Sequence, residues 1–180
     1  MLQPNFHFEG RYNLLKLLGR GGFSEVWLAE DLMANVLVAI KVYSPGQGLD
    51  DEGIEMFRKE FALVADMNHT NLLRPTFYGY WQRMPYLVLP YCENGSLENY
   101  INNGKRVSEE EAWRILRDVA SGLAYLHNHK PPVVHQDIKP GNILIGMNGP
   151  EECYMITDFG ISAKMRNTVG ADRKAFSSGT

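Results

Sequence analysis

Short apolar runs separated by turn-forming residues predict several β-strands in the first half of the chain. Residues 12–18 and 25–30 are rich in leucine and other apolar side chains, and each run suits one strand. The stretch between them, residues 19–24, reads Gly-Arg-Gly-Gly-Phe-Ser. A glycine-containing turn between two such runs is typical of a hairpin, so we expect two antiparallel strands joined by this turn.

A further apolar run, residues 36–43, contains a single charged residue, Lys41. The two-residue period of a strand places Lys41 on the same face as Ala39 and opposite to Ile40 and Val42. An unpaired buried charge costs several kcal/mol, so Lys41 in a buried strand needs an anionic partner. The alternative is an edge-strand lysine that protects the sheet from aggregation.

Residues 51–67 predict a helix, in which Phe57 and Phe61 share one apolar stripe. Glu60 lies within that stripe, where an apolar residue is expected. A pair between Glu60 and Lys41 would explain both unusual charges. The alternative for Glu60 is a partly solvated carboxylate.

The second half begins after a buried strand at residues 85–89, because the polar, Pro- and Gly-containing stretch 90–96 marks a boundary. Ser108 followed by Glu111 predicts a capping box at the start of a long helix. That helix carries a broad apolar stripe formed by Ala112, Ile115, Leu116, Val119, Ala120, Leu123 and Leu126.

Residues 135–142, His-Gln-Asp-Ile-Lys-Pro-Gly-Asn, predict a tight loop. Pro140 lacks a backbone N–H group and Gly141 permits unusual φ values, so neither suits the interior of a helix or strand. Strand-like runs at 132–134 and 143–145 hold the loop at both ends, which is how a rigid functional loop is built. The polar groups of the loop include Asp137, Lys139 and Asn142.

Composition and charge exclude several classes of function. The 180-residue chain has a net charge of −3, which gives no reason to expect nucleic acid or an anionic membrane as a partner. No apolar stretch is long enough to cross a bilayer. The two cysteines, Cys92 and Cys153, cannot form a disulfide framework and lack metal-ligand spacing, which favours a cytoplasmic location. The sequence sets no expectation for oligomeric state or for a membrane anchor beyond Thr180.

Together these segments resemble the eukaryotic-type protein kinases in their Ser/Thr form. The loop at 135–142 resembles their catalytic loop, and the segment 158–160, Asp-Phe-Gly, resembles their metal-binding triplet. The sequence Val-Ala-Ile-Lys at 38–41 resembles the strand that carries their phosphate-binding lysine. The stretch 19–24 resembles their glycine-rich loop. The compact leader and short loops suggest a bacterial member.

The resemblance implies an α+β fold. The expected protein-kinase-like architecture is an antiparallel-sheet N-lobe with one key helix plus an incomplete, mainly helical C-lobe. The implied boundaries are a leader at 1–11, the N-lobe at 12–89, a hinge at 90–96, and a partial C-lobe at 97–180 that ends inside the activation segment.

The resemblance also implies ATP-dependent phosphoryl transfer to Ser or Thr hydroxyls of a protein substrate, autophosphorylation included. Asp137 would accept the proton of the substrate hydroxyl or orient it, and Lys139 would neutralise charge on the γ-phosphate. Lys41 would hold the α- and β-phosphates and would pair with Glu60.

The implied cofactors are ATP and Mg²⁺. Asn142 and Asp158 would hold the metal, since Mg²⁺ prefers oxygen ligands. The residues implied at the nucleotide, with Leu89 as the gatekeeper, are Leu18, Gly19, Arg20, Gly21, Gly22, Phe23, Ser24, Val26, Ala39, Lys41, Leu89, Pro90, Cys92 and Leu144.

Two departures from the family pattern keep alternatives open. Ser24 stands at the third glycine position, and Gln136 stands where many kinases have an Arg that meets an activation-segment phosphate. We therefore expect that the segment does not need phosphorylation for order. Truncation favours a nucleotide-binding pseudokinase or an inactive fragment as the alternative. A small-molecule kinase is less favoured because of Lys139 and Pro140, and a dinucleotide-binding oxidoreductase because a strand follows Ser24.

Overall fold

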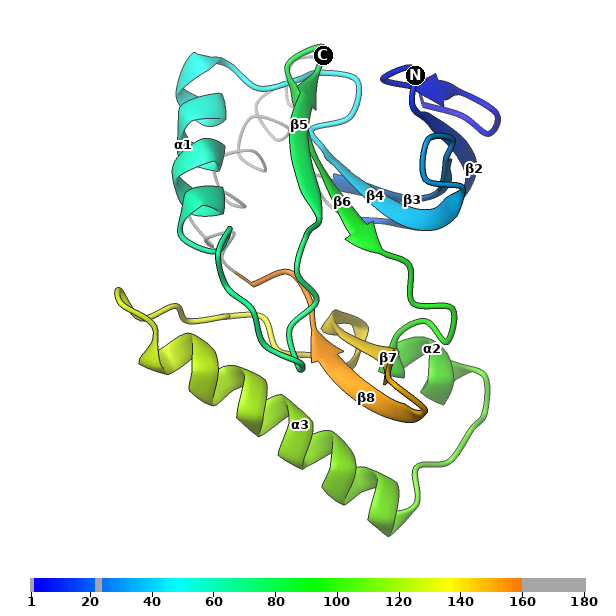
Figure 1. Ribbon diagram of the computed structural model, residues 1–180, viewed down its shortest axis with the longest axis vertical. Coiled ribbons are helices and arrows are strands. Elements are labelled where there is room, and N and C mark those ends of the chain that lie inside the picture. The colour runs from blue at the N-terminus through cyan, green and yellow to red at the C-terminus, as the bar shows by residue number, and fades with distance from the viewer. Residues whose placement is uncertain (1, 22–23, 160–180) are drawn as a thin grey trace, which may run out of the picture. The chain divides into compact units, whose positions relative to one another are not determined.

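The computed structural model describes residues 2–21 and 24–159, which form two compact units (Figure 1). The first contains the described residues up to 62 together with 75–91. The second contains 63–74 and the described residues from 92 onward.

The first unit is built on one antiparallel sheet. Within the described residues the sheet has six strands in the order β1-β2-β3-β4-β6-β5. The hairpin expected around the glycine-rich turn is confirmed, since β2 and β3 pair antiparallel on either side of it. The elements of this unit are β1 (His7–Phe8), β2 (Tyr12–Arg20), β3 (Ser24–Asp31), β4 (Val36–Tyr43), α1 (Asp51–Ala62), β5 (Phe77–Trp81) and β6 (Met84–Pro90).

The first residues of the chain take part in this sheet. The segment expected to be a leader contains β1, which pairs with β2, and Phe8 is fully buried in the core. The aromatic ring of Phe8 packs edge-to-face on Tyr86 and against Trp81. An aromatic side chain buries more apolar area than most, so these residues strengthen the core rather than trail from it.

The two faces of the sheet have different roles, and the strand register separates them. Trp27, Ile40 and Val88 are cross-strand partners in one row and belong to the apolar core. The neighbouring row brings Lys41 and Val26 together on the opposite face. The alternation predicted for residues 36–43 is therefore confirmed.

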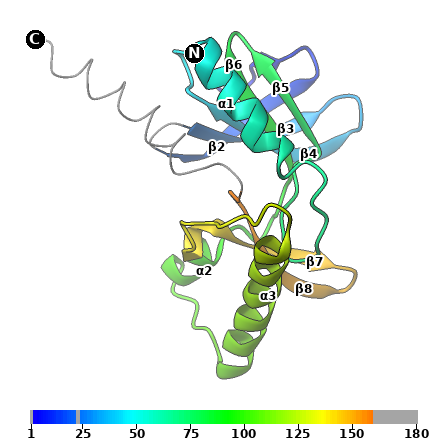
Figure 2. The ribbon, with the colours of Figure 1, turned by 90° about the vertical axis from the view of Figure 1, so that its left-hand side faces the viewer.

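Helix α1 packs against one face of the sheet (Figure 2), and its ring contacts identify this face as the one that carries Lys41. The ring of Phe57 lies 5.0 Å from that of Tyr43, and Phe61 lies 4.2 Å from Tyr78. Tyr43 and Tyr78 point to the Lys41 face because they follow the two-residue period of β4 and the register of β5 with β6. The beginning of α1 is held by Arg83, whose guanidinium donates to the Leu49 carbonyl oxygen at 2.9 Å.

The helix is shorter than predicted, because α1 ends at Ala62 and not at residue 67. The apolar residues that follow, Val64 and Met67, are buried in the core of the second unit together with Leu72. The chain must leave the helix to place them there.

The second unit combines two helices with a small hairpin. Its elements are α2 (Leu97–Asn102), α3 (Glu109–Asn128), the 3₁₀ turn η1 (Pro140–Asn142), β7 (Ile143–Asn148) and β8 (Glu151–Ile156). Strands β7 and β8 pair antiparallel, and α3 packs against β8. None of the helices in the described residues is long and apolar enough to span a bilayer.

The start of α3 is only partly as predicted. Ser108 is the N-cap and its hydroxyl accepts the Glu111 N–H group at 3.2 Å. The Glu111 carboxylate does not complete the capping box, because it accepts hydrogen bonds from the hydroxyls of Tyr154 and Tyr100. Tyr154 is fully buried, and a buried hydroxyl needs an acceptor.

The apolar stripe of α3 is also narrower than predicted. Ile115 and Leu126 are buried, whereas Leu116 is 60% exposed. Asp118 occupies a buried position on the packed face, where its carboxylate accepts the backbone N–H group of Tyr154 at 3.1 Å. A buried carboxylate is stable here because it receives this bond and a pair of bonds from Arg117.

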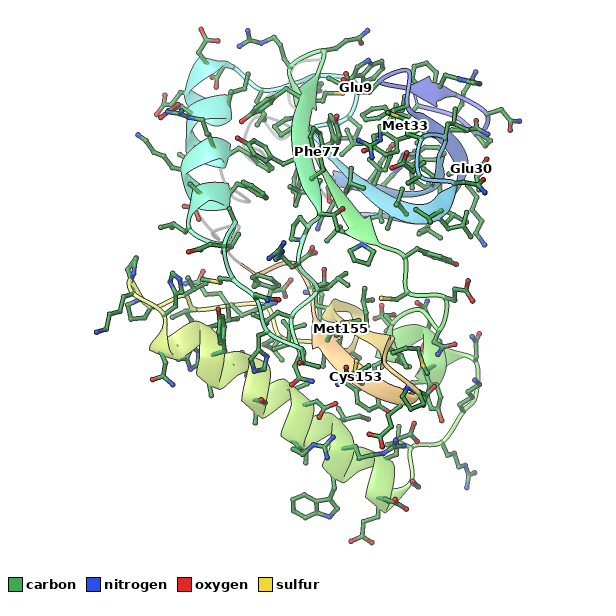
Figure 3. The ribbon with its side chains drawn as sticks, in the orientation of Figure 1. Glu9, Glu30, Met33, Phe77, Cys153 and Met155 are labelled. Atoms are coloured by element: carbon green, nitrogen blue, oxygen red, sulfur yellow. The ribbon has the colours of Figure 1, made fainter. Side chains whose placement is uncertain are left out.

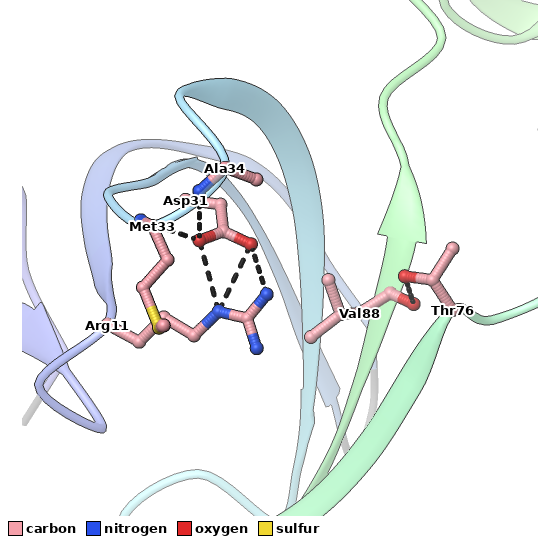
Figure 4. A network of polar contacts seen from close by, with 6 residues as sticks. All are labelled: Arg11, Asp31, Met33, Ala34, Thr76 and Val88. Atoms are coloured by element: carbon pink, nitrogen blue, oxygen red, sulfur yellow. Dashed lines mark hydrogen bonds and ion pairs between the residues drawn. The ribbon is translucent and has the colours of Figure 1, made fainter.

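An ion pair closes the far end of the β2–β3 hairpin (Figure 4). Arg11 donates from Nη2 and Nε to the Asp31 carboxylate, at 2.6 Å and 3.0 Å respectively to Oδ2 and Oδ1. Oδ1 of Asp31 also accepts the N–H groups of Met33 and Ala34, which fixes the turn after β3. These bonds hold the pKa of Asp31 at about 2, below its usual value.

We predict that Asp31→Asn destabilises the protein at neutral pH and not in strong acid. Asparagine keeps the oxygen that caps the turn but loses the charge. A lowered carboxyl pKa contributes stability above the unfolded value of 3.8, and this contribution is lost as the pH falls through about 2. The melting temperature of the variant should be lower by roughly 3 °C at neutral pH.

Thermal unfolding of the wild type and of Asp31→Asn, measured from neutral pH into the acid range, checks this prediction. The two melting temperatures should converge as the pH approaches about 2. Glu93→Gln, which removes an exposed carboxylate, is the control, and its melting temperature should equal that of the wild type at each pH. A difference that persists in strong acid would contradict the assignment.

We also predict that Gly122→Ala destabilises the protein, although Ala is the better helix former. A Cβ atom at Gly122 would lie 2.9 Å from the Asn71 carbonyl oxygen and 3.0 Å from Ile156 Cδ1. The backbone oxygen cannot move aside cheaply, so the expected loss is about 1–3 kcal/mol. Denaturant unfolding measures it. The exposed neighbour Ala120→Gly should follow propensity alone and lose about 1 kcal/mol. A Gly122→Ala variant more stable than the wild type would contradict this prediction, because it would show that α3 moves away from Asn71 and Ile156 at little cost.

Candidate active site

The loop 135–142 is tied to the end of β8 by a buried histidine. Nε2 of His135 lies 2.8 Å from the Thr157 carbonyl oxygen, and Nδ1 lies 3.2 Å from the backbone N of Asp137. A backbone N–H group can only donate, so Nδ1 is the acceptor and Nε2 carries the proton. In this neutral tautomer the His135 ring connects the backbone N–H group of Asp137 to the carbonyl oxygen of Thr157, the residue that precedes Asp158. His135 is only 3% exposed; its bond to Thr157 is buried and its bond to Asp137 is partly buried.

Asn142 holds the loop from its other end. Its Nδ2 donates to the carbonyl oxygen of Asp137 at 2.8 Å and to the carboxylate Oδ2 of Asp137 at 3.1 Å. The backbone carbonyl oxygen of Asn142 accepts the N–H group of Thr157 at 3.0 Å. A single buried amide therefore fixes the backbone and the side chain of Asp137 at once.

Lys139 completes the polar group around Asp137. Its Nζ lies 3.0 Å from Oδ2 of Asp137, the same oxygen that receives the Asn142 amide. The two side chains are 55% and 39% exposed, so the pair is open to solvent and to a ligand. An oriented carboxylate with a cation beside it can accept a proton from a bound hydroxyl while the cation meets an anionic group.

Two residues of this region have an uncommon backbone conformation. Gln136 and Asp158 have φ values of 63° and 65°, a region that non-glycine residues rarely adopt. Such conformations persist only where the surroundings fix them, and they cluster at functional sites. Here the fixing contacts are the bonds of His135 and the burial of Phe159, which packs in the same apolar cluster as Ile156.

The metal-binding pair predicted from the sequence suits Mg²⁺ in its chemistry. The amide nitrogen of Asn142 is used by Asp137, and among the described residues no hydrogen bond uses its oxygen Oδ1. Asp158 follows Thr157, which is bonded to the backbone of Asn142. Both residues offer oxygen, the donor that Mg²⁺ prefers. No group of three or more His, Cys, Asp or Glu side chains in the described part could hold a metal ion.

The residues predicted to meet the nucleotide divide between the two units. Cys92 and Leu144 belong to the second unit, where Leu144 forms a bridge with Ser96. Gly22 and Phe23 lie outside the described residues. The others lie on the strands of the first unit: Leu18, Gly19 and Arg20 on β2, Ser24 and Val26 on β3, Ala39 and Lys41 on β4, and Leu89 and Pro90 on β6, with Gly21 directly after β2.

The register brings the central members of this set onto one face. Lys41 pairs with Val26, and Ala39 pairs with Leu89. Val26 also pairs with Gly19, so the glycine-rich turn is next to the row that contains Lys41. A small residue at position 39 leaves room for a flat ligand beside a cation.

The predicted ion pair between Lys41 and Glu60 does not occur in the described part of the chain. Lys41 is buried in β4, and its Nζ lies 5.4 Å from the centre of the Tyr43 ring. Glu60 is half-buried on α1. Lys41 has further contacts besides this ring. The pairing of Lys41 with Glu60 remains a prediction.

Cys92 has the properties of a packing residue. Burial raises the pKa of its thiol to about 11, and the nearby Cys153 adds to the shift. A thiol is reactive only as the thiolate, so neither side chain is poised for chemistry. Cys153 and Met155 lie on β8 (Figure 3), and the Cys92 sulfur lies close to the same strand pair at Gly146.

The sequence did not reveal the part played by His135 and Thr157. His135 belongs to the recognised loop motif, but nothing in its spacing shows that its ring bridges to a carbonyl oxygen 22 residues later. The only available signal was a polar residue placed directly after an apolar run.

Comparisons with known proteins agree with this arrangement. The protein kinase domain family matches residues 12–179. The chain is 40% identical over 164 residues to the mouse serine/threonine-protein kinase tousled-like 2, and the matched region covers 86% of this chain and 22% of that protein. It is 35% identical over 160 residues to the serine/threonine-protein kinase PrkC of Bacillus subtilis, covering 89% of this chain and 24% of the relative. The chain thus spans about a quarter or less of these relatives.

A solved structure supports the fold independently. The kinase domain of Mycobacterium tuberculosis PknI superposes with a TM-score of 0.73 at 24% identity, covering 91% of this chain and 63% of that one. At this identity the likeness shows the fold. Because the sequence relatives come from a vertebrate and a bacterium, a bacterial origin for this chain stays a prediction.

We predict that Asn142→Asp gives the protein a pH-dependent loss of stability. The variant would place a second carboxylate about 3 Å from Oδ2 of Asp137, where Nδ2 now donates. Two carboxylates at this distance cannot both ionise without cost, so the loss should grow as the pH rises above about 5 and reach roughly 2 kcal/mol. Urea unfolding at several pH values measures it. Asn142→Ala lacks the second charge and should show a loss that does not vary with pH. If the stability losses of Asn142→Asp and Asn142→Ala varied with pH in the same way, the Asp137 carboxylate would have to point away from position 142, against this prediction.

Proposed function

Because the chain belongs to the protein kinase domain family, we propose that it transfers the γ-phosphoryl group of ATP to Ser or Thr hydroxyls of a protein substrate. The observation that supports this proposal most is the fixed position of Asp137, whose carboxylate accepts a hydrogen bond from the Asn142 amide and forms an ion pair with Lys139. Phosphoryl transfer asks a protein mainly for positioning and charge neutralisation, and this loop offers both. Since the chain spans less than a third of its relatives, the activity of the whole protein is part of the proposal.

In this proposal Asp137 orients the substrate hydroxyl and accepts its proton. The bonds from Asn142 fix the carboxylate before the substrate arrives, so little reorganisation is needed during reaction. Lys139 exchanges part of its contact with Asp137 for the γ-phosphate as the negative charge there develops. Mg²⁺ bound by Asn142 and Asp158 would neutralise phosphate charge.

On the first unit, the row of Gly19, Val26 and Lys41 would receive the nucleotide. The buried ammonium of Lys41 supplies the charge for the α- and β-phosphates. Ala39 and Leu89 form the adjoining apolar row, which suits a flat purine. The proposed location is the cytoplasm.

The alternative proposal is a nucleotide-binding pseudokinase or an inactive fragment. It is favoured by two departures from the family pattern, Ser24 at the third glycine position and Gln136 in place of the usual arginine. The retained group around Asp137 argues against it, because nucleotide binding alone does not require a fixed proton acceptor.

The test is transfer of phosphate from Mg²⁺-ATP to a generic basic protein by the full natural polypeptide. We expect Asp137→Asn to lower kcat by about 10²–10⁴-fold, the usual worth of a general base, with little change in ATP affinity. Asp158→Ala should remove activity through loss of the metal. Glu110→Gln, at an exposed residue of α3, is the matched control and should retain full activity.

The outcomes separate the two proposals. Phosphoserine or phosphothreonine formed by the wild type and lost in Asp137→Asn would support the kinase. ATP binding without transfer under any condition would favour the pseudokinase. An Asp137→Asn variant as fast as the wild type would overturn the assigned role.

A further inference from the structure

A buried carboxylate lies at the turn end of the β2–β3 hairpin, directly beside the glycine-rich turn. Arg20 and Glu25 are cross-strand partners and form the last pair before that turn. Nη2 of Arg20 lies 2.9 Å from Oε1 of Glu25. A second link closes the same end, since the N–H group of Gly21 donates to the Ser24 carbonyl oxygen at 2.8 Å.

The carboxylate of Glu25 is also anchored to the core. Its second oxygen, Oε2, accepts the indole N–H group of Trp27 at 3.1 Å. Trp27 is 3% exposed and belongs to the apolar core of the first unit. Glu25 is itself 8% exposed, whereas the Arg20 side chain is 66% exposed. The chain of contacts therefore runs from the fixed core, through Glu25, to a solvent-exposed arginine at the turn.

This chain of contacts lies on the face of the sheet opposite to Lys41. Glu25 and Trp27 are two residues apart on β3, so they share a face, and Val26 between them points to the other. Val26 is the cross-strand partner of Lys41. The Glu25 and Trp27 side chains can thus hold the end of β3 without occupying space on the nucleotide face.

We propose that Glu25 is a positioning residue for the phosphates of the nucleotide, acting through Arg20 and Trp27. The inference rests on the proposed function and adds to it a residue that touches no ligand. Glycine-rich turns bind phosphate through backbone N–H groups, so the direction of these groups depends on how the strand ends are held. Fixing the last strand pair, Arg20 and Glu25, to the core holds both strand ends in place before the nucleotide binds, which reduces the ordering cost of binding.

Electrostatics adds a second requirement to this arrangement. An uncompensated carboxylate near the turn would repel the triphosphate, and Arg20 neutralises it. Loss of Arg20 should therefore weaken phosphate binding more than loss of the Glu25 charge does. Removing both should resemble the removal of Glu25 alone.

The experiment compares the dissociation constants of ATP and adenosine for the full natural polypeptide, by calorimetry. The two ligands share the base and sugar, so a change confined to ATP reports on the phosphates. We expect Arg20→Met to raise the ATP dissociation constant roughly ten-fold and Glu25→Gln roughly three- to five-fold. The double variant should equal Glu25→Gln, and Arg20→Lys should stay within about two-fold of the wild type. Adenosine affinity should not change in any of them.

Lys16→Met is the matched control, because it removes another exposed positive charge from β2 and Lys16 forms no ion pair among the described residues. It should leave both constants unchanged. In turnover measurements the Arg20 and Glu25 variants should raise KM for ATP and leave kcat within about two-fold.

Three results would overturn the inference. One is an Arg20→Met variant with wild-type ATP affinity, and another is an equal loss of ATP and adenosine affinity, which would show a general loss of structure. The third is a double variant with the summed loss of the two single ones. A wild type that binds no ATP would instead overturn the proposed function, and the inference with it.

Discussion

The active-site loop depends on one buried amide, that of Asn142. Within six residues the loop must present an acid, a cation and an oxygen donor, and flexible side chains at such spacing would otherwise sample many arrangements. The Asn142 amide removes this freedom because it binds both the backbone and the carboxylate of Asp137. The loop is then fastened to the strand end through Thr157, whose N–H and carbonyl groups bind Asn142 and His135. The His135–Thr157 bond is buried and the Asn142–Asp137 bonds are partly buried, so the loop is fastened before any ligand arrives.

The first unit solves a related problem by a different means. Here the functional groups come from separate strands, and the sheet register aligns them without any local motif. The polar links sit at the two ends of the β2–β3 hairpin, Arg11–Asp31 at one and Arg20–Glu25 at the other. The apolar core occupies the face between them. Strand pairing thus sets the position of Lys41, while ion pairs hold the two ends of the hairpin.

Much of this could be predicted from the sequence. The alternation in residues 36–43 gave the face of Lys41, and the turn chemistry gave the β2–β3 hairpin. The errors have a common cause, since each involves a partner remote in the chain. The helix α1 stops early because Val64 is buried in the second unit. Glu111 leaves its capping role because Tyr154, 43 residues later, requires an acceptor.

By itself the sequence determined which chemical groups are present, where β2, β3, β4, β6 and α3 lie, and which residues lie in the loop, because periodicity and turn residues are local properties. The strand-like run expected at residues 132–134 does not form a strand. The tertiary structure decided how the polar groups are used: the tautomer of His135, the two tyrosine bonds of Glu111, and the hold on Glu25. Each of these depends on which distant donor or acceptor is buried beside the group. Burial without a partner is costly, so the final choice of partner follows from packing and not from local pattern.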